Sequence, residues 1–238
     1  MNGSTSNGVV GFNLEGAQRT ADRLNGSFNE FYNLIDNAMY ALADIIFFNG
    51  EAGMGSNLSN TGWYAPEAVT FEKTVFEPTY SELFNDMHNL YTDIYEKVES
   101  SIIKWAQTTG AGAVRVTRYD RTISKGSRRT YPTAKMADPN NNIRISPALG
   151  RAINKQMKDI LNSYNAGRAE VINQLRGNEA YLGAGQQASL IANVSKMLDK
   201  VEKRITETYE KAAAEVNKSI DKYQRIARQI ANSFNKTN

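Results

Sequence analysis

The chain has 238 residues, of which 41% are hydrophobic and 22% charged, and its formal net charge is +3 at pH 7. It contains no cysteine, which excludes disulfides and thiolate metal sites and leaves packing to stabilise the fold. No stretch approaches the roughly 20 apolar residues of a membrane span, so we expect none. The N-terminus has neither a basic start nor an apolar run of signal-peptide length, which predicts a soluble, leaderless protein.

Charge is divided unevenly along the chain. Residues 1–110 hold 5 Lys/Arg and 14 Asp/Glu, a net charge of −9, whereas residues 111–238 hold 23 and 11, a net charge of +12. The halves could face each other, within one molecule or between copies. The basic half could instead meet an acidic partner such as nucleic acid or a membrane surface, or both could simply be solvated surfaces.

The first long element is predicted over residues 13–48, after a flexible N-terminus at residues 1–12. Apolar or small residues recur there at alternating steps of three and four, which is typical of an amphipathic helix. Asn13 is the expected N-cap, because its side-chain oxygen can accept a hydrogen bond from an early backbone N–H. The stripe consists of Leu14, Ala17, Ala21, Leu24, Phe28, Phe31, Ile35, Ala38, Leu42 and Ile45.

A second helix is predicted to run antiparallel to the first. The glycine-bearing residues 49–60 indicate a loop, and Trp63 follows it, where we expect a partly buried side chain that closes the apolar seam at the turn. A second stripe of the same period extends from residue 76 to residue 105, and Pro78 near its start predicts a kink or a fresh first turn. Together these elements predict an acidic helical hairpin over residues 13–110.

Residues 111–146 differ in composition from the rest. Alternating β-branched residues and turn signals predict an extended arm or a small β-hairpin. The segment holds 8 basic and 2 acidic residues, with tyrosines among the arginines, so it is the best candidate for a contact with nucleic acid or an acidic protein surface. An exposed linker kept soluble by charge is the alternative. The candidate contact residues are Arg115, Arg118, Arg121, Lys125, Arg128 and Arg129.

A second, basic hairpin is predicted over residues 147–238. Ser146 and Pro147 fit an N-cap and a first helical residue, and the stripe that follows ends near Gly177. After a short loop, a fourth helix continues to Phe234, on the order of 70 Å if unbroken. The fold class is therefore all-α, with two long antiparallel helical hairpins, bundle-like or coiled-coil-like, joined by the basic arm.

The sequence predicts no catalytic, cofactor-binding or metal-binding residues. His88 is the only histidine, which excludes a histidine-rich metal site, and a hydrogen-bonded or solvated role fits it better than general-base catalysis. Carboxylates at Asp93, Glu96 and Glu99 have helix-face spacing, for which solubility and local pairing are the ordinary explanation. We therefore expect a protein that is not an enzyme.

The turn and the second helix carry a family resemblance. Gly62-Trp63-Tyr64-Ala65 lies between two striped helices, and Tyr95 and Glu99 form a Tyr-x-x-x-Glu motif. Over residues 14–109 this pattern resembles the Trp-x-Gly family of helical hairpins, the Esx-type substrates of type VII secretion. The resemblance implies a leaderless, non-enzymatic protein that dimerises through its hairpin and is exported without a signal peptide, or that partners a secreted effector.

A structural assembly protein is the alternative. A phage neck, ring or head-associated component would stack long helices between copies, while the basic arm would touch nucleic acid or a neighbouring subunit. Both interpretations predict a homo-oligomer or a helical protein partner. They differ in location, because the first protein is exported and the second belongs to a virion.

Overall fold

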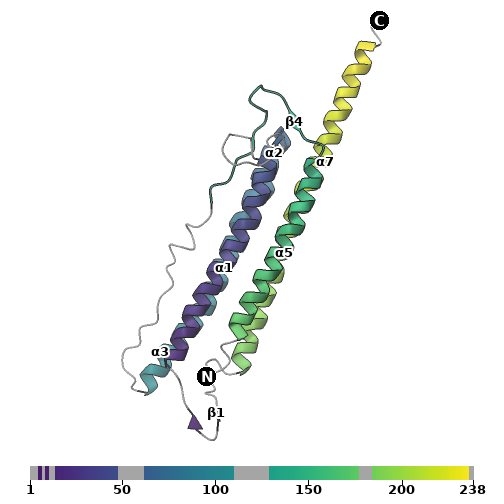
Figure 1. Cartoon of the computed structure of the whole chain (residues 1–238). Coiled ribbons are helices and arrows are strands. Elements are labelled where there is room, and N and C mark those ends of the chain that lie inside the picture. Colours follow the sequence, from purple (N-terminus) through teal and green to yellow (C-terminus); the bar gives the residue numbers. More distant parts are fainter. Residues whose placement is uncertain are drawn as a thin grey trace. The chain divides into compact units, whose positions relative to one another are not determined.

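The computed structural model describes residues 5–6, 9–10, 14–47, 62–109, 129–176 and 184–235. Helix accounts for 84% of the described residues, which confirms the prediction of a mostly helical protein (Figure 1). Within these ranges, none of the helices combines the length and apolar character that crossing a bilayer requires. The long helices are α1 (Leu14–Phe47), α3 (Glu77–Thr109), α5 (Leu149–Arg176) and α7 (Ala184–Asn235).

The chain forms two compact units, and each is assembled from segments that are far apart in the sequence. The first unit takes Met1–Asp36, Glu82–Arg128 and Asn162–Glu202. The second takes Asn37–Ser81, Arg129–Leu161 and Lys203–Asn238. Each unit therefore contains part of every long helix and draws on both the acidic and the basic half of the sequence. The boundaries that the sequence predicts at residues 13, 111 and 147 stay a prediction.

In the first unit, α1 and α3 pack through aromatic side chains. Phe28 has no exposed surface, and its ring centroid lies 4.8 Å from that of Tyr91, in an edge-to-face arrangement. Phe31 adds a second edge-to-face contact with Phe28 at 5.7 Å. This geometry is preferred because the positive ring edge meets the negative face. The two apolar stripes therefore form one core here.

Helix α5 contacts both α1 and α7 in the first unit. A Cβ on Gly167 would lie 2.8 Å from Leu34 Cδ1, so the missing side chain is what permits this close approach to α1. On the other side, the buried Tyr164 hydroxyl donates to the Leu198 carbonyl of α7 at 3.0 Å. Burial raises the pKa of Tyr164 well above its ordinary value, because the phenolate would lose its solvation.

Ion pairs at the surface of the first unit link α7 to α3 and to α5. The Lys200 ammonium on α7 lies 2.8 Å from an Asp86 carboxylate oxygen on α3. Arg168 on α5 lies 2.5 Å from Asp199 and 3.2 Å from Glu202, both on α7. Exposed pairs of this kind contribute little to stability, about 0 to 1 kcal/mol each. Their value is positional, since they fix which faces meet.

In the second unit, the start of the second helical region is not one regular α-helix. Helix α2 (Pro66–Phe71) is followed by the π-helical turn η1 (Glu72–Phe76), and α3 begins at Glu77. The Glu77 backbone N–H donates to the Glu72 carbonyl, five residues earlier. A wider turn suits this place because Pro78 has no N–H to donate to residue 74. The sequence predicts a kink or a fresh first turn at Pro78, and α3 indeed begins one residue before it, directly after the π-helical turn.

Two short antiparallel sheets accompany the helices. Strand β3 (Trp63–Tyr64) pairs with β4 (Arg144–Ile145), with Trp63 opposite Ile145. Within the described part of the basic arm, residues 129–146, the strand pairing is therefore with the turn that precedes α2. Strands β1 (Thr5–Ser6) and β2 (Val9–Val10) form the other sheet, which the sequence analysis did not predict.

The beginning of α5 follows the predicted cap. Ser146 Oγ accepts a hydrogen bond from the Ala148 N–H at 3.3 Å, and the Leu149 N–H donates to the Ser146 carbonyl at 3.0 Å. These bonds satisfy early helix groups that have no partner within the helix. The predicted N-cap Asn13 and loop 49–60 lie outside the described residues.

Candidate interaction site

The candidate site is built around Trp63, where the chain enters α2. The Trp63 side chain is 1% exposed, so it is more deeply buried than the sequence predicts. Its ring centroid lies 5.8 Å from that of Phe71. Ala65 is extended and Pro66 opens α2, an arrangement that proline at a first helical position favours. Among the residues that the structure describes, the buried indole N–H has no hydrogen-bond partner, so the described contacts of the ring are packing contacts.

The segment of residues 129–146 lies against the acidic helices of the second unit. Arg129 Nη2 donates to Asn37 Oδ1 on α1 at 2.6 Å. The same guanidinium lies over the Tyr40 ring, 4.4 Å from its centroid, which is within the range of a cation–π interaction. Arg129, one of the predicted contact residues, therefore contacts the protein's own acidic half.

Tyr131 anchors the segment next to the π-helical turn. Its hydroxyl donates to the Glu77 carboxylate, and its ring packs edge-to-face on Phe76, with 4.9 Å between centroids. Three residues further on, the Ala134 N–H donates to Glu72 Oε2 at 3.2 Å. The carboxylates at both ends of η1 are therefore used to hold the basic segment.

The carboxylates of this site differ in electrostatic environment. Burial raises the pKa of Glu72 and the nearby Glu77 adds to the effect, while the Ala134 N–H and Lys73 oppose them. Burial also acts to raise the pKa of Glu67, but hydrogen bonds, the largest from Lys222, outweigh it and leave that pKa below its usual value. Glu67 is thus held as an anion, whereas Glu72 is partly destabilised as one.

Glu67 joins α2 to the last part of α7. The Lys222 ammonium lies 2.5 Å from Glu67 Oε1, and the Tyr223 hydroxyl donates to Glu67 Oε2 at 3.1 Å. The pKa of Lys222 is raised, chiefly because of its hydrogen bond to Glu67. This cluster connects the acidic half of the sequence with the basic half inside the second unit.

The outer edge of the 129–146 segment is an ordered turn with apolar side chains on either side of it. Asp138 Oδ1 accepts from the Asn140 and Asn142 N–H groups at 2.9 and 2.8 Å, and Asn141 adopts a φ of 62°. Asparagine tolerates this left-handed conformation better than most residues. Met136 and Ile143 are 62% and 47% exposed. The site therefore presents apolar surface on either side of a hydrogen-bonded turn, and loops often carry the binding residues of a protein.

The structure describes only some of the predicted site residues. Tyr95 and Glu99 lie within α3, one helical turn apart, but their side chains lie outside the described part. His88, also on α3, is partly buried and takes part in an interaction. Of the predicted basic contacts only Arg129 is described; the others, at Arg115, Arg118, Arg121, Lys125 and Arg128, lie outside the described residues.

Sequence reasoning missed the carboxylates of α2 and η1 and the exposed pair Met136 and Ile143. The run Asp138-Pro-Asn-Asn-Asn is a recognisable turn signal, and apolar residues beside a turn are candidates for a contact surface. Glu67, Glu72 and Glu77 carry no such signal, since they are spaced like any helical surface acids. Only the fold shows that residues between 54 and 156 positions later in the chain reach them.

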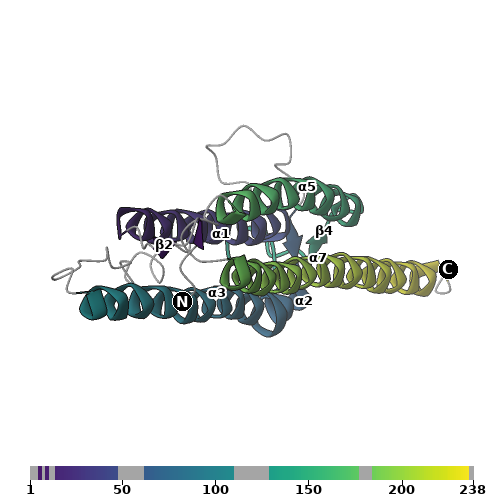
Figure 2. The same cartoon turned by 90° about the horizontal axis from the view of Figure 1, so that it is seen from below.

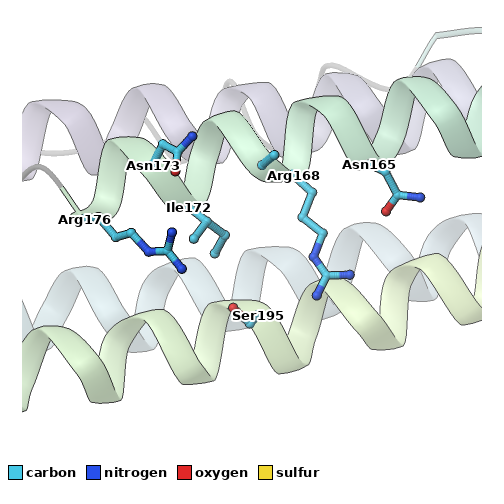
Figure 3. Close-up of a pocket in the computed structure, with 7 residues that line it drawn as sticks. Asn165, Arg168, Ile172, Asn173, Arg176 and Ser195 are labelled. Carbon is cyan, nitrogen blue, oxygen red and sulfur yellow. The ribbon is translucent and has the colours of Figure 1, made fainter.

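A shallow hollow of about 430 Å³ lies between α5 and α7 in the first unit. Figure 3 shows Arg168 and Arg176 extending from α5, with Ser195 on the facing helix. Arg168 is engaged by two α7 carboxylates, so its charge is already compensated. The hollow is therefore a weak candidate for a ligand site. The exposed apolar surface of the 129–146 segment is a better candidate for a binding surface, and its partner would be a protein.

The described carboxylates of the site are engaged with other parts of the second unit: Glu67 with Lys222, Glu72 with the Ala134 N–H and Glu77 with Tyr131. In the parts of the chain that the structure describes, no three His, Asp or Glu side chains are placed to hold a metal ion. No family model matches the chain, and neither a curated protein nor a solved structure matches it. Its function therefore has to be inferred from its own residues.

Proposed function

We propose that the chain is a non-enzymatic helical interaction protein that self-associates, similar in kind to the Trp-x-Gly hairpins that type VII secretion exports. The observation that supports this most is the burial of Trp63 at the junction of α1 and α2, the position of the turn tryptophan in such hairpins. The carboxylates of the elements that follow it in the chain, Glu67, Glu72 and Glu77, bind Lys222, the Ala134 N–H and Tyr131. They are occupied in holding the protein together.

The contacts within the first unit support a four-helix arrangement for this protein. Helix α1 meets α3 through Phe28 and Tyr91, and α5 meets α1 at Gly167. Helix α5 meets α7 through Tyr164, and α7 meets α3 through Lys200. These contacts close a circuit of four helices, which is the pattern of a bundle with antiparallel neighbours.

We propose that copies meet through the surface of the 129–146 segment. Met136 and Ile143 are large, exposed apolar side chains, and the Asp138 turn holds the backbone between them. A preorganised apolar contact lowers the entropic cost of association. The residues at the edge of this surface are polar, as they are in the rim of a protein interface.

Sedimentation velocity of the full chain tests self-association. We expect a dimer or a larger closed assembly, and a shift toward monomer in Met136→Gln/Ile143→Gln. The matched control is Ile226→Gln/Ile230→Gln, which removes similar exposed apolar surface from α7 and leaves this surface intact. A wild-type chain that stays monomeric at about 100 µM, well above typical interface dissociation constants, contradicts the proposal.

Export is tested separately from self-association. In a bacterium that has a type VII secretion system, we expect the chain to reach the medium and Tyr95→Ala/Glu99→Ala to stay inside the cell. Arg129→Gln serves as the control, because it changes one surface contact without touching the motif. Retention of the wild-type chain, or equal export of the Tyr95/Glu99 variant, contradicts the secretion assignment.

A structural component of a virion is the second candidate. Helix α7 has 52 residues, and long helices can stack between copies to build closed rings. Electron microscopy of the purified protein separates the candidates. Closed rings favour the virion component, and compact dimers favour the secreted hairpin.

A further inference from the structure

The C-terminal part of α7 differs from the rest of that helix in burial. Val216 has no exposed surface and Ser219 is 2% exposed, whereas every residue from Gln224 to Phe234 is exposed. Three helical turns thus continue beyond the packed part of the second unit. We call residues 222–235 the α7 end.

Helix α7 is no longer covered beyond about residue 223 because the elements that pack against it, α5 and α2, have their first turns at this level. A Cβ on Gly150 would lie 2.6 Å from Asn217 Oδ1, so the first turn of α5 is beside residue 217. Helix α2 reaches slightly further, where Glu67 binds Lys222 and Tyr223. Figures 1 and 2 both show the α7 end running on past β4 and the start of α5.

The α7 end is amphipathic although it is exposed. Ile226, Ile230 and Phe234 are spaced by four residues and are 39%, 53% and 73% exposed, so they form one apolar stripe. At about 100° per residue, Arg225 and Arg228 lie on the opposite face, roughly 140–160° away from the centre of the stripe.

The charge of α7 changes at the same place. Residues 184–221 contain 6 Lys/Arg and 6 Asp/Glu, whereas residues 222–238 contain 4 Lys/Arg and no Asp/Glu. The packed part is balanced and the exposed end is wholly basic. A helix that combines an apolar stripe containing a phenylalanine with a polar face whose charged residues are all basic has the composition of interfacial membrane helices.

We propose that the α7 end binds the surface of an anionic lipid membrane and lies along it, with Ile226, Ile230 and Phe234 at the boundary between headgroups and acyl chains. The headgroup layer surrounds a helix at this depth, so lipid phosphates can reach cations on its far face as well as at its margins. This function goes beyond self-association and uses a different surface.

Other partners would use only part of these features. A second copy of the α7 end would bring its own basic residues, among them Arg225 and Arg228, close to those of the first and would supply no acidic residue to pair with them. A nucleic acid would bind the basic residues but leave the apolar stripe in water. An apolar groove of a protein would bury the stripe and leave Arg225 and Arg228 on the outer face. The lipid surface alone engages both faces of the helix.

Flotation with lipid vesicles tests the proposal on the full chain. We expect binding to vesicles of phosphatidylcholine and phosphatidylglycerol at a ratio of about 7:3, and binding at least roughly tenfold weaker to phosphatidylcholine alone. Removal of either face, in Ile226→Gln/Ile230→Gln or Arg225→Gln/Arg228→Gln, should weaken binding by roughly tenfold or more. A chain ending at Tyr223 should not bind.

Two variants serve as matched controls. Lys155→Gln/Lys158→Gln removes the same charge from exposed positions of α5, and Met136→Gln/Ile143→Gln removes exposed apolar surface elsewhere; both should float like the wild type. The proposal is overturned if the wild type does not float, if it binds both vesicle types equally, or if the α7-end variants bind as the controls do. A concentration-dependent dimer that is lost in Ile226→Gln/Ile230→Gln, without flotation, would identify a second copy as the partner instead.

Discussion

The packed part of α7 and its exposed end both carry apolar residues at helical spacing, but only the packed part buries them. Val201 and Ile205 are 1% and 0% exposed, whereas Ile226 and Ile230, with the same helical spacing, are 39% and 53% exposed. The difference lies in the neighbours, because α5 begins at Leu149 and α2 at Pro66. An apolar stripe on a helix therefore indicates which face can be buried. The lengths of the surrounding elements decide how much of that face is buried.

The largest expected effect compares two isoleucines of the same helix. Ile205→Ala should destabilise the protein by about 3 kcal/mol, because it removes buried methyl groups and leaves a cavity. Ile230→Ala should change the free energy of unfolding by less than about 0.5 kcal/mol, since its side chain is already half exposed. Urea denaturation of both variants measures the difference. Equal losses would mean that the α7 end is packed in solution.

A smaller effect on stability is expected from substituting one tyrosine in the packed part of α7 and one in the α7 end. The Tyr209 hydroxyl donates to the Ala38 carbonyl at 2.6 Å in the core, so Tyr209→Phe should cost about 1 kcal/mol. Tyr223→Phe loses a partly exposed bond to Glu67 and should cost less. Burial raises the pKa of Tyr209 above its ordinary value of 10.0, so wild-type stability should fall more steeply above about pH 10 than that of Tyr209→Phe. Parallel alkaline unfolding curves would contradict this.

The contact of Glu67 with Lys222, where the packed part of α7 meets the α7 end, should depend on pH. The folded pKa of Glu67 is lowered, so its contribution is complete above its unfolded value of 4.5 and is lost as the pH falls through the folded pKa. Glu67→Gln should therefore lower the melting temperature slightly at about pH 7, and the difference should disappear near about pH 3.

Glu72→Gln is the matched comparison, with the opposite sign. The folded pKa of Glu72 is raised, so its charge opposes folding at neutral pH and acid relieves the cost. The glutamine variant should melt no lower than the wild type at about pH 7. Melting curves between about pH 3 and pH 7 test both carboxylates, and the same pH dependence in both variants would show that the Lys222 contact is absent.

The smallest expected effect is that of deleting the α7 end. A chain ending at Tyr223 loses only residues that are exposed or outside the described part, so its melting temperature should stay within about 2 °C of the wild type. Differential scanning calorimetry measures this. A large decrease would show that the α7 end packs against the rest of the protein and stabilises the fold.

The sequence alone predicts the long helices well, because each carries an uninterrupted stripe with a period of three to four residues. The cap at Ser146 is also predicted, since a serine followed by proline has a local physical meaning. For Pro78 the sequence predicts only a kink or a fresh first turn, not the π-helical turn that precedes it. Proline cannot donate the backbone hydrogen bond of a regular helix interior. A kink, a new helix start or a π-helical turn can each accommodate the missing N–H.

The candidate site is less predictable. Trp63 is singled out by its place between two helices, and the structure buries it further than expected. The contacts of Arg129 with Asn37 and of Tyr131 with Glu77 join residues 92 and 54 positions apart. No periodicity in the sequence encodes such pairs, because each surface carboxylate or arginine looks locally like any other.

The sequence by itself thus determines the helices, their apolar faces and the uneven distribution of charge, all of which depend on residues within a few turns of one another. The tertiary structure decides which faces find a partner. It places the 129–146 segment against Glu72 and Glu77, buries Ile205 and leaves Ile230 exposed. The physical reason is that burial depends on where other elements begin and end, and that information is distributed over the whole chain rather than held in the stripe itself.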